Sequence, residues 1–272
     1  MTPPPPAHVP PAPAVLRLVQ ELVFGRWRST GEELYREVAA LTGAGPGGEV
    51  LVSGCGDGTS CEWIAQRTGA AVSGVDPDGD RVEAADQRAR ERAERGAPLP
   101  LAYQQAPYED LPHETAVFDA AVGEPGLAAA GAPARAVGEL ARVVKPLGAV
   151  VLLQLTWSSE LSAEARALLV DRLGMRPRLV VEWKQMLRDA GVVDLQVQDW
   201  TDAGADGAAD DAPQLTWPQK AQIIARAWRR WGWRGALEAV EREESLLREL
   251  SRERAIGFQV IRGVKWPHAK GA

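Results

Sequence analysis

Three glycines at alternate positions, followed further along by an aspartate, form the clearest candidate binding site in the sequence. Gly54, Gly56 and Gly58 come after a short apolar segment and before residues with helical spacing. Glycines let the backbone come close to a ligand, and the start of a helix offers unpaired N–H groups to the negative part of that ligand. Asp76 ends a second apolar segment, where a carboxylate can accept hydrogen bonds from both hydroxyls of a ribose. The pattern therefore predicts a site for a ribose-containing cofactor.

The spacing of these glycines differs from that of a dinucleotide site. Dinucleotide-binding folds typically carry the motif G-x-G-x-x-G, and here Thr59 stands in the place of the last glycine. The sequence therefore disfavours a nicotinamide-dependent dehydrogenase.

Two side chains are candidates for moving a proton at this site. Ligands of open α/β sheets bind beyond the carboxyl ends of the strands, and Glu124 lies two residues after the end of the strand expected at residues 118–122. His113 comes slightly earlier in the chain, and its ordinary pKa near neutrality suits a general base. The alternative for each is a solvated loop residue without a catalytic role.

The chain contains ten tryptophans. Aromatic side chains of this size can line a pocket for a flat or apolar acceptor, and Trp157, Trp228 and Trp231 are the candidates. Ile224, Trp228 and Trp231 share one face of a helix, so ordinary packing is the alternative. The two cysteines, Cys55 and Cys61, show no metal-ligand spacing, and we expect no metal site.

The segments that carry these residues alternate between strands and helices. Strands are expected at residues 49–53, 70–75, 101–104, 118–122 and 148–155, with helices at 59–68, 80–95 and 133–144. A helix at 180–190, a strand at 194–200, a helical segment at 217–254 with a break at 232–235, and a last strand at 256–266 follow. This order predicts an α/β fold with a doubly wound, mostly parallel seven-stranded sheet.

Composition divides the chain into five parts. A proline-rich tail expected to be disordered covers residues 1–14, and helices cover residues 15–45. The α/β core covers residues 46–200, an acidic linker and a helical insertion residues 201–255, and the last strand and a C-terminal tail residues 256–272. The insertion is expected to act either as a lid over the acceptor pocket or as the interface of a homodimer.

Bulk properties narrow the class of function. Apolar residues make up 45% and charged residues 25% of the chain, as in ordinary globular proteins. The net charge of -6 gives no sign of a nucleic-acid-binding surface. No stretch has the length of a membrane span, and the first residues lack the pattern of a signal peptide. A cytoplasmic enzyme with a small-molecule substrate is therefore expected.

Several segments resemble the class I S-adenosylmethionine-dependent methyltransferase family, and most closely its branch of ubiquinone and menaquinone biosynthesis methyltransferases. The segment Val-Leu-Val-Ser-Gly-Cys-Gly-Asp-Gly at 50–58 resembles the first motif of the family, and Gly-Val-Asp at 74–76 the second. The other similar segments are residues 109–112 with 118–122, 139–148, 183–191 and 256–265. The resemblance implies a Rossmann-like fold and S-adenosylmethionine as the cofactor.

The resemblance also implies roles for individual residues. The cofactor-binding set comprises Ser53, Gly54, Cys55, Gly56, Gly58, Asp76, Pro77, Ala106, Pro107 and Tyr108. Within this set, Pro77 and the segment 106–109 are expected to recognise the adenine, and packing on the surface is the alternative for Tyr108. The N-terminal helices are expected to cover the active site, with Trp27 and Tyr35 as pocket residues. The chain departs from the family at Val52, where an acidic residue is usual, and in the large insertion before the last strand.

The predicted function is methylation of a small apolar or aromatic metabolite with S-adenosylmethionine. Two alternatives stay open at this point. One is a different reaction with the same cofactor, such as a cyclisation. The other is a binding protein that has the fold without the activity.

Overall fold

The computed structural model describes residues 31–157, 162–163, 166–167, 170, 176–200, 217–252 and 256–267. The chain forms two compact units. One comprises residues 30–159, 175–203 and 256–272 and contains the sheet. The other comprises residues 1–29, 160–174 and 204–255 and contains helix α8.

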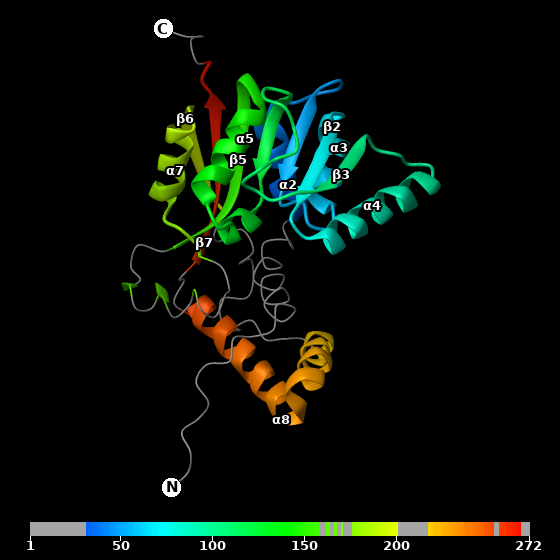
Figure 1. Ribbon diagram of the computed structural model, residues 1–272, viewed down its shortest axis with the longest axis vertical. Helices are drawn as coiled ribbons and strands as arrows, with labels where there is room; N and C mark the ends of the chain where they lie inside the picture. The colour runs from blue at the N-terminus through cyan, green and yellow to red at the C-terminus, as the bar shows by residue number, and fades with distance from the viewer. Residues whose placement is uncertain are drawn as a thin grey trace. The chain divides into compact units, whose positions relative to one another are not determined.

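A seven-stranded sheet forms the centre of the first unit (Figure 1). Its strands lie in the order β3-β2-β1-β4-β5-β7-β6. The strand bounds are β1 Glu49–Ser53, β2 Ala71–Asp76, β3 Leu101–Gln105, β4 Phe118–Gly123, β5 Val144–Trp157, β6 Val192–Asp199 and β7 Ile256–Lys265. Strands β1 to β5 pair in parallel, whereas β7 pairs antiparallel with both β5 and β6. The predicted mostly parallel, seven-stranded sheet is confirmed, and its order is that of the class I methyltransferase fold.

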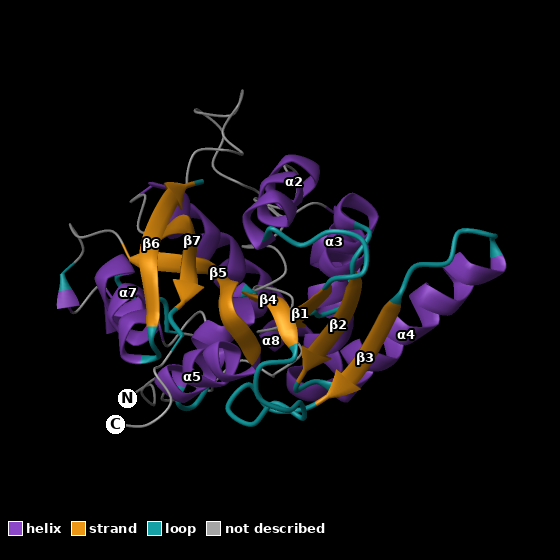
Figure 2. Cartoon of the chain, turned by 90° about the horizontal axis from the view of Figure 1, so that it is seen from above, coloured by secondary structure: helices purple, strands orange, loops and turns teal. Residues whose placement is uncertain are grey.

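Helices cover both faces of the sheet (Figure 2). Helices α2 (Gly31–Thr42) and α3 (Thr59–Thr68) pack together on one face, and α5 (Pro133–Val143) and α7 (Val180–Asp189) pack on the other. Helix α4 (Gly79–Glu94) packs along β2 and β3. A short 3-10 helix, η1 (Pro125–Ala129), follows β4 and was not expected from the sequence.

The central strands are apolar because both of their faces are covered. Val50, Leu51 and Val52 of β1 have no exposed surface. Fully buried side chains of this size contribute about 1.5–3 kcal/mol each relative to exposure. The sheet edge where β1, β2 and β4 end is therefore held by a rigid, apolar centre.

Local signals in the sequence place the helix ends. Helix α3 begins after Gly58 and ends at Gly69, and both glycines have a positive φ. The Asp78 side chain accepts a hydrogen bond from Asp80 N at the start of α4, 3.1 Å away. These caps satisfy backbone groups that a helix end leaves unpaired, so the expected helix bounds were nearly correct.

Helix α8 (Trp217–Arg252) lies in the second unit and is bent at Gly232, which has φ 69° and ψ -177°. The break expected at residues 232–235 is therefore confirmed. The buried side chains of α8 include Ile223 and Ala227, whereas Trp228 is 59% exposed. Ile224 and Trp231 are half-buried, so the expected stripe of Ile224, Trp228 and Trp231 is partly exposed, and its role as a lid or as a dimer interface stays a prediction.

No described helix has the length and apolar content needed to cross a membrane. The residues of the N-terminal tail and of the helix expected at 15–24 lie outside the described part of the chain, as does the acidic linker at 202–211.

Candidate cofactor and catalytic site

The glycine loop turns sharply at the carboxyl end of β1. Gly54, Gly56 and Gly58 have φ values of 86°, 56° and 81°, a region that side chains strongly disfavour. Gly54 N donates to Val75 O at 2.7 Å, which holds the loop against the end of β2. The loop therefore presents its backbone at the sheet edge, as the sequence predicted.

Asp76 lies at the end of β2 and is bonded to this loop. Its Oδ2 accepts from Gly56 N at 3.0 Å, and its Oδ1 accepts from Asp78 N at 3.0 Å. The side chain is only 3% exposed. Burial raises the pKa of Asp76, and the two backbone N–H groups oppose that shift. The structure thus brings together the glycines and the aspartate that the sequence singled out.

Tyr103 supports the loop from beneath and was missed in the sequence. Its hydroxyl donates to Gly58 O at 3.4 Å. A Cβ on Gly58 would lie 2.6 Å from this hydroxyl, and a Cβ on Gly74 would lie 2.6 Å from the Cδ1 of the ring. Gly74 and Gly58 are therefore needed to make room for Tyr103, a pairing that spacing along the chain does not reveal.

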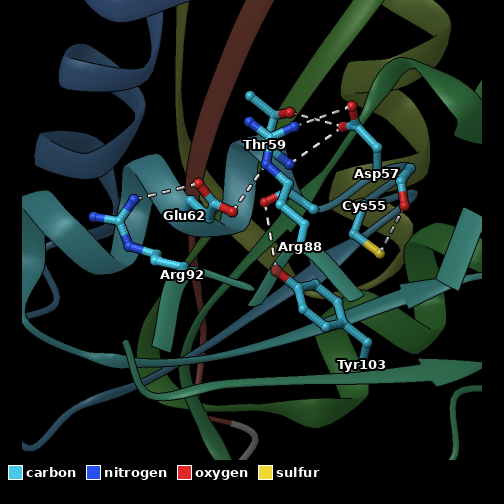
Figure 3. A network of polar contacts seen from close by, with 9 residues as sticks. Cys55, Asp57, Thr59, Glu62, Arg88, Arg92 and Tyr103 are labelled. Carbon is cyan, nitrogen blue, oxygen red and sulfur yellow. Dashed lines mark hydrogen bonds and ion pairs between the residues drawn. The ribbon is translucent and has the colours of Figure 1, made fainter. Parts of the chain in front are cut away.

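A network of charged side chains fixes the start of α3 to α4 (Figure 3). Arg88 Nε donates to Glu62 Oε1 at 2.9 Å, and Arg88 Nη1 lies 3.5 Å from Asp57 Oδ2. Arg92 Nη1 lies 3.7 Å from Glu62 Oε2. Asp57 Oδ1 accepts from the Thr59 hydroxyl at 2.8 Å. The network stiffens the helix start that a ligand would face.

The two segments that the resemblance assigned to adenine recognition lie next to each other. Gln105 Nε2 donates to Pro77 O at 3.0 Å, and Ala106 N donates to Asp76 O at 3.2 Å. Pro77 and Pro107 are exposed, whereas Ala106 is buried. The structure therefore brings the end of β2 and the residues after β3 into one surface.

Tyr108 reaches from this surface across the edge of the sheet. Its Cε1 lies 3.6 Å from the point where a Cβ on Gly54 would stand. Its hydroxyl lies 2.5 Å from the corresponding point on Gly126, in η1. Burial raises the pKa of Tyr108 above its ordinary value, and the neighbouring Asp76 carboxylate adds to the shift. The ring therefore packs between Gly54, after β1, and Gly126, in η1 after β4.

Glu124 and Tyr35 meet at the end of β4. The Tyr35 hydroxyl donates to Glu124 Oε1 at 2.9 Å and lies 3.1 Å from Oε2. Glu124 N donates to Ser53 O at 2.9 Å, so this residue directly borders the glycine loop. Both side chains are at most 9% exposed. A candidate base and a candidate pocket residue, named separately from the sequence, thus form one pair.

Gln154 fixes the backbone beneath that pair. Its Nε2 donates to Glu124 O at 2.9 Å and to Gly123 O at 3.2 Å. The side chain is fully buried in β5. The sequence signal for this role is a single amide within the apolar segment 150–155, and it was missed.

His113 lies at the opposite end of β4. Its ring packs edge-on against Phe118, the first residue of that strand, with 5.0 Å between ring centroids. Burial lowers the pKa of His113, and Arg142 lowers it further. The expectation that His113 stands beyond the carboxyl end of β4 is therefore wrong, since the loop before the strand keeps it at the amino end.

Arg142 anchors the His113 loop through a partly buried ion pair. It donates to Glu139 Oε2 at 2.7 Å and to the carbonyl oxygens of Leu111 and His113 at 3.1 and 2.8 Å. Its hydrogen bonds to Glu139 hold the pKa of that carboxyl below its ordinary value. Arg142 and Glu139 therefore have a structural role in this loop.

This ion pair should make stability depend on pH. Because the folded-state pKa of Glu139 is lowered, its stabilisation is present above the unfolded value and is lost as pH falls through the folded value. We expect Glu139→Gln to lower the free energy of unfolding by about 1 kcal/mol at pH 7. The difference from the parent, measured by urea unfolding, should shrink between pH 5 and pH 3. An equal difference at both ends of that range would contradict this role.

The remaining predicted residues lie in different parts of the chain. Cys55 is buried beside Gly74, and Val52 is buried within β1. Trp157 is 7% exposed at the carboxyl end of β5. Trp27 lies outside the described residues, and Trp228 and Trp231 belong to α8 in the second unit. Their assignment to an acceptor pocket stays a prediction. The described residues contain no group of three potential metal ligands.

Comparison with known proteins agrees with this geometry. Residues 51–152 match the model of a methyltransferase domain. A 2-phytyl-1,4-naphtoquinone methyltransferase from Nostoc sp. is 37% identical over 125 residues, which cover 44% of this chain and 53% of that protein. The chain thus spans about half the length of the curated relatives it matches.

Solved structures share the fold at low sequence identity. The cyclase SpnF has a TM-score of 0.67 and 22% identity, over 88% of this chain and 83% of its own. The geranyl diphosphate C-methyltransferase of Streptomyces coelicolor A3(2) has a TM-score of 0.62 and 18% identity, over 87% of this chain and 76% of its own. These similarities establish the fold that surrounds the glycine loop.

Proposed function

We propose that this chain is a class I S-adenosylmethionine-dependent methyltransferase, which transfers a methyl group from S-adenosylmethionine to a small organic molecule. The observation that carries the proposal is the bond between Gly56 N and the Asp76 carboxylate at the end of β2. This hydrogen bond links the glycine loop to a buried carboxylate, and both lie within residues 51–152, which match the methyltransferase domain. Relatives with known names in this family include a quinone methyltransferase, which supports an acceptor of small size.

The residues present suit this cofactor. Gly56 leaves open space beside the loop, since the nearest atom to an added Cβ would be Arg81 Nη1 at 3.8 Å. Asp76 has a carboxylate of the kind that accepts ribose hydroxyls, and Pro77, Ala106 and Pro107 border it for the adenine. When bound, S-adenosylmethionine supplies an electrophilic methyl group on a sulfonium centre.

The chain would then have to position the acceptor and exclude water. Glu124 is the candidate to take a proton from the acceptor, and Tyr35 orients its carboxylate through the hydroxyl. Gln154 holds the backbone of Glu124 in place. Within the described residues, these buried groups lie beside the loop that would carry the cofactor.

The proposal is tested by binding and by product analysis. Isothermal titration with S-adenosylmethionine separates an enzyme from a binding protein that lacks the cofactor. Mass spectrometry of a panel of quinones, phenols and isoprenoids then looks for products heavier by one methylene. A bound cofactor with rearranged but unmethylated products would favour a cyclase instead, and no binding at all would end the proposal.

Asp76 provides a direct test of the cofactor site. We expect Asp76→Asn to weaken binding of S-adenosylhomocysteine at least about tenfold, because loss of charge-assisted hydrogen bonds costs roughly 1.5–3 kcal/mol. Asp86→Asn is the matched control, since Asp86 lies on the exposed side of α4 in an ion pair with Arg90. Equal affinities for both variants and the parent, by titration calorimetry, would remove Asp76 from the site.

A further inference from the structure

Tyr108 occupies the part of the sheet edge that the proposed cofactor has to cross. The strand order at this edge is β3-β2-β1-β4. Tyr108 follows β3, yet its side chain touches the positions over Gly54, at the end of β1, and Gly126, after β4. The ring therefore takes up the space over Gly54, in the loop that the proposed cofactor has to approach.

The burial of the surrounding groups agrees with this placement. Asp76 is 3% and Ser53 1% exposed, although both face the edge where ligands of such sheets bind. Burial raises the pKa of Tyr108, and the charge of the Asp76 carboxylate raises it further. A cofactor that approaches the loop at Gly54 therefore meets this ring first.

Few bonds hold the ring in that position. The Tyr108 hydroxyl makes no hydrogen bond within the described residues, and the space it fills exists because Gly126 lacks a Cβ. A Cβ at Gly126 would stand 2.5 Å from the hydroxyl, a distance at which one of the two must shift. Packing alone retains the ring, so a rotation of the side chain can release it.

We propose that Tyr108 is a gate on the cofactor site, which lies over Gly54 at the end of β1 and turns away when the cofactor binds. The inference rests on the proposed function, because it concerns the same site. It assigns Tyr108 a role in the affinity and the rate of cofactor binding. It differs from the expectation that Tyr108 is a contact for the adenine, since a gate competes with the ligand whereas a contact supports it.

The test compares binding of S-adenosylhomocysteine to the full chain and three variants by titration calorimetry. Removal of the ring in Tyr108→Ala should increase affinity at least fivefold. Tyr108→Phe keeps the ring and should stay within twofold of the parent. Gly126→Ala should also increase affinity, because its Cβ displaces the hydroxyl, and it should add nothing in the Tyr108→Ala background. If Tyr108→Ala does not fold, the affinity of Gly126→Ala alone tests the gate.

Stopped-flow association gives a second readout. With a gate, the observed rate should reach a plateau at high ligand concentration in the parent and in Tyr108→Phe, and should rise linearly in Tyr108→Ala. A loss of affinity in Tyr108→Ala would make the ring a ligand contact and overturn the gate, as would unchanged affinity and linear rates throughout. If neither the parent nor any variant binds, the proposed function itself fails.

Discussion

Replacing Gly56 with valine is expected to abolish detectable binding of S-adenosylmethionine while the protein still folds. Gly56 has φ 56°, and the nearest atom to its added Cβ would be Arg81 Nη1 at 3.8 Å. The side chain therefore has room within the protein and points to the ligand side of the loop. A branched residue with positive φ costs roughly 1–2 kcal/mol, which a core of this size tolerates.

A matched control separates strain from loss of the site. Gly96 follows α4, has φ 80° and has no atom within 4 Å of its added Cβ. Gly96→Val should lower the melting temperature as much as Gly56→Val but should leave affinity for S-adenosylhomocysteine within twofold of the parent. If Gly56→Val binds as the parent does in titration calorimetry, the glycine loop does not hold the cofactor.

Glu124→Gln is expected to reduce turnover by about 10²- to 10⁴-fold for an acceptor that must lose a proton. The amide keeps the shape of the carboxylate and can still accept from the Tyr35 hydroxyl, but it cannot take up a proton. Binding of S-adenosylhomocysteine should remain within about twofold, because the backbone bond from Glu124 N to Ser53 O is unchanged. Initial rates at saturating cofactor measure the effect.

Two further variants test whether the loss of turnover comes from the hydrogen-bonded pair of Glu124 and Tyr35. Tyr35→Phe removes the donor to Glu124 and should reduce turnover by a smaller factor, since the carboxylate stays in place. Glu114→Gln alters an exposed carboxylate near the amino end of β4 and should leave turnover unchanged. Parent-like turnover in Glu124→Gln would show that this carboxylate takes no part in proton transfer.

The sequence predicted the sheet, its helices and the cofactor loop because these depend on neighbouring residues. Gly54, Gly56 and Gly58 mark the loop through their own backbone freedom, and Asp76 follows at the end of the next strand. The contacts of Tyr103 and Tyr108 could not be predicted, because each side chain reaches residues on other strands. His113 was placed at the wrong end of β4, since spacing along a loop does not say on which side of a sheet it runs.

The partners of Gln154 and Tyr35 could not be predicted either, although both are polar or amphipathic residues in apolar patterns. The Tyr35 hydroxyl donates to the carboxylate of Glu124, and Gln154 Nε2 donates to its backbone carbonyl. A buried amide without a partner would cost several kcal/mol, so its presence in β5 signals a partner without naming it. Only the arrangement of β4 beside β5 identifies which carbonyl groups it serves.

The hairpin of β6 and β7 has a consequence for how this fold can diversify. Trp200 N donates to Phe258 O at 2.8 Å, so the chain leaves the sheet and returns to it at adjacent points. The entropy of closing such a loop grows only with the logarithm of its length, by about 0.6 kcal/mol for each doubling. A change in the length of residues 201–255 should therefore add little to the entropic cost of closing the chain between β6 and β7. Natural variation can reshape this region while the cofactor loop stays fixed.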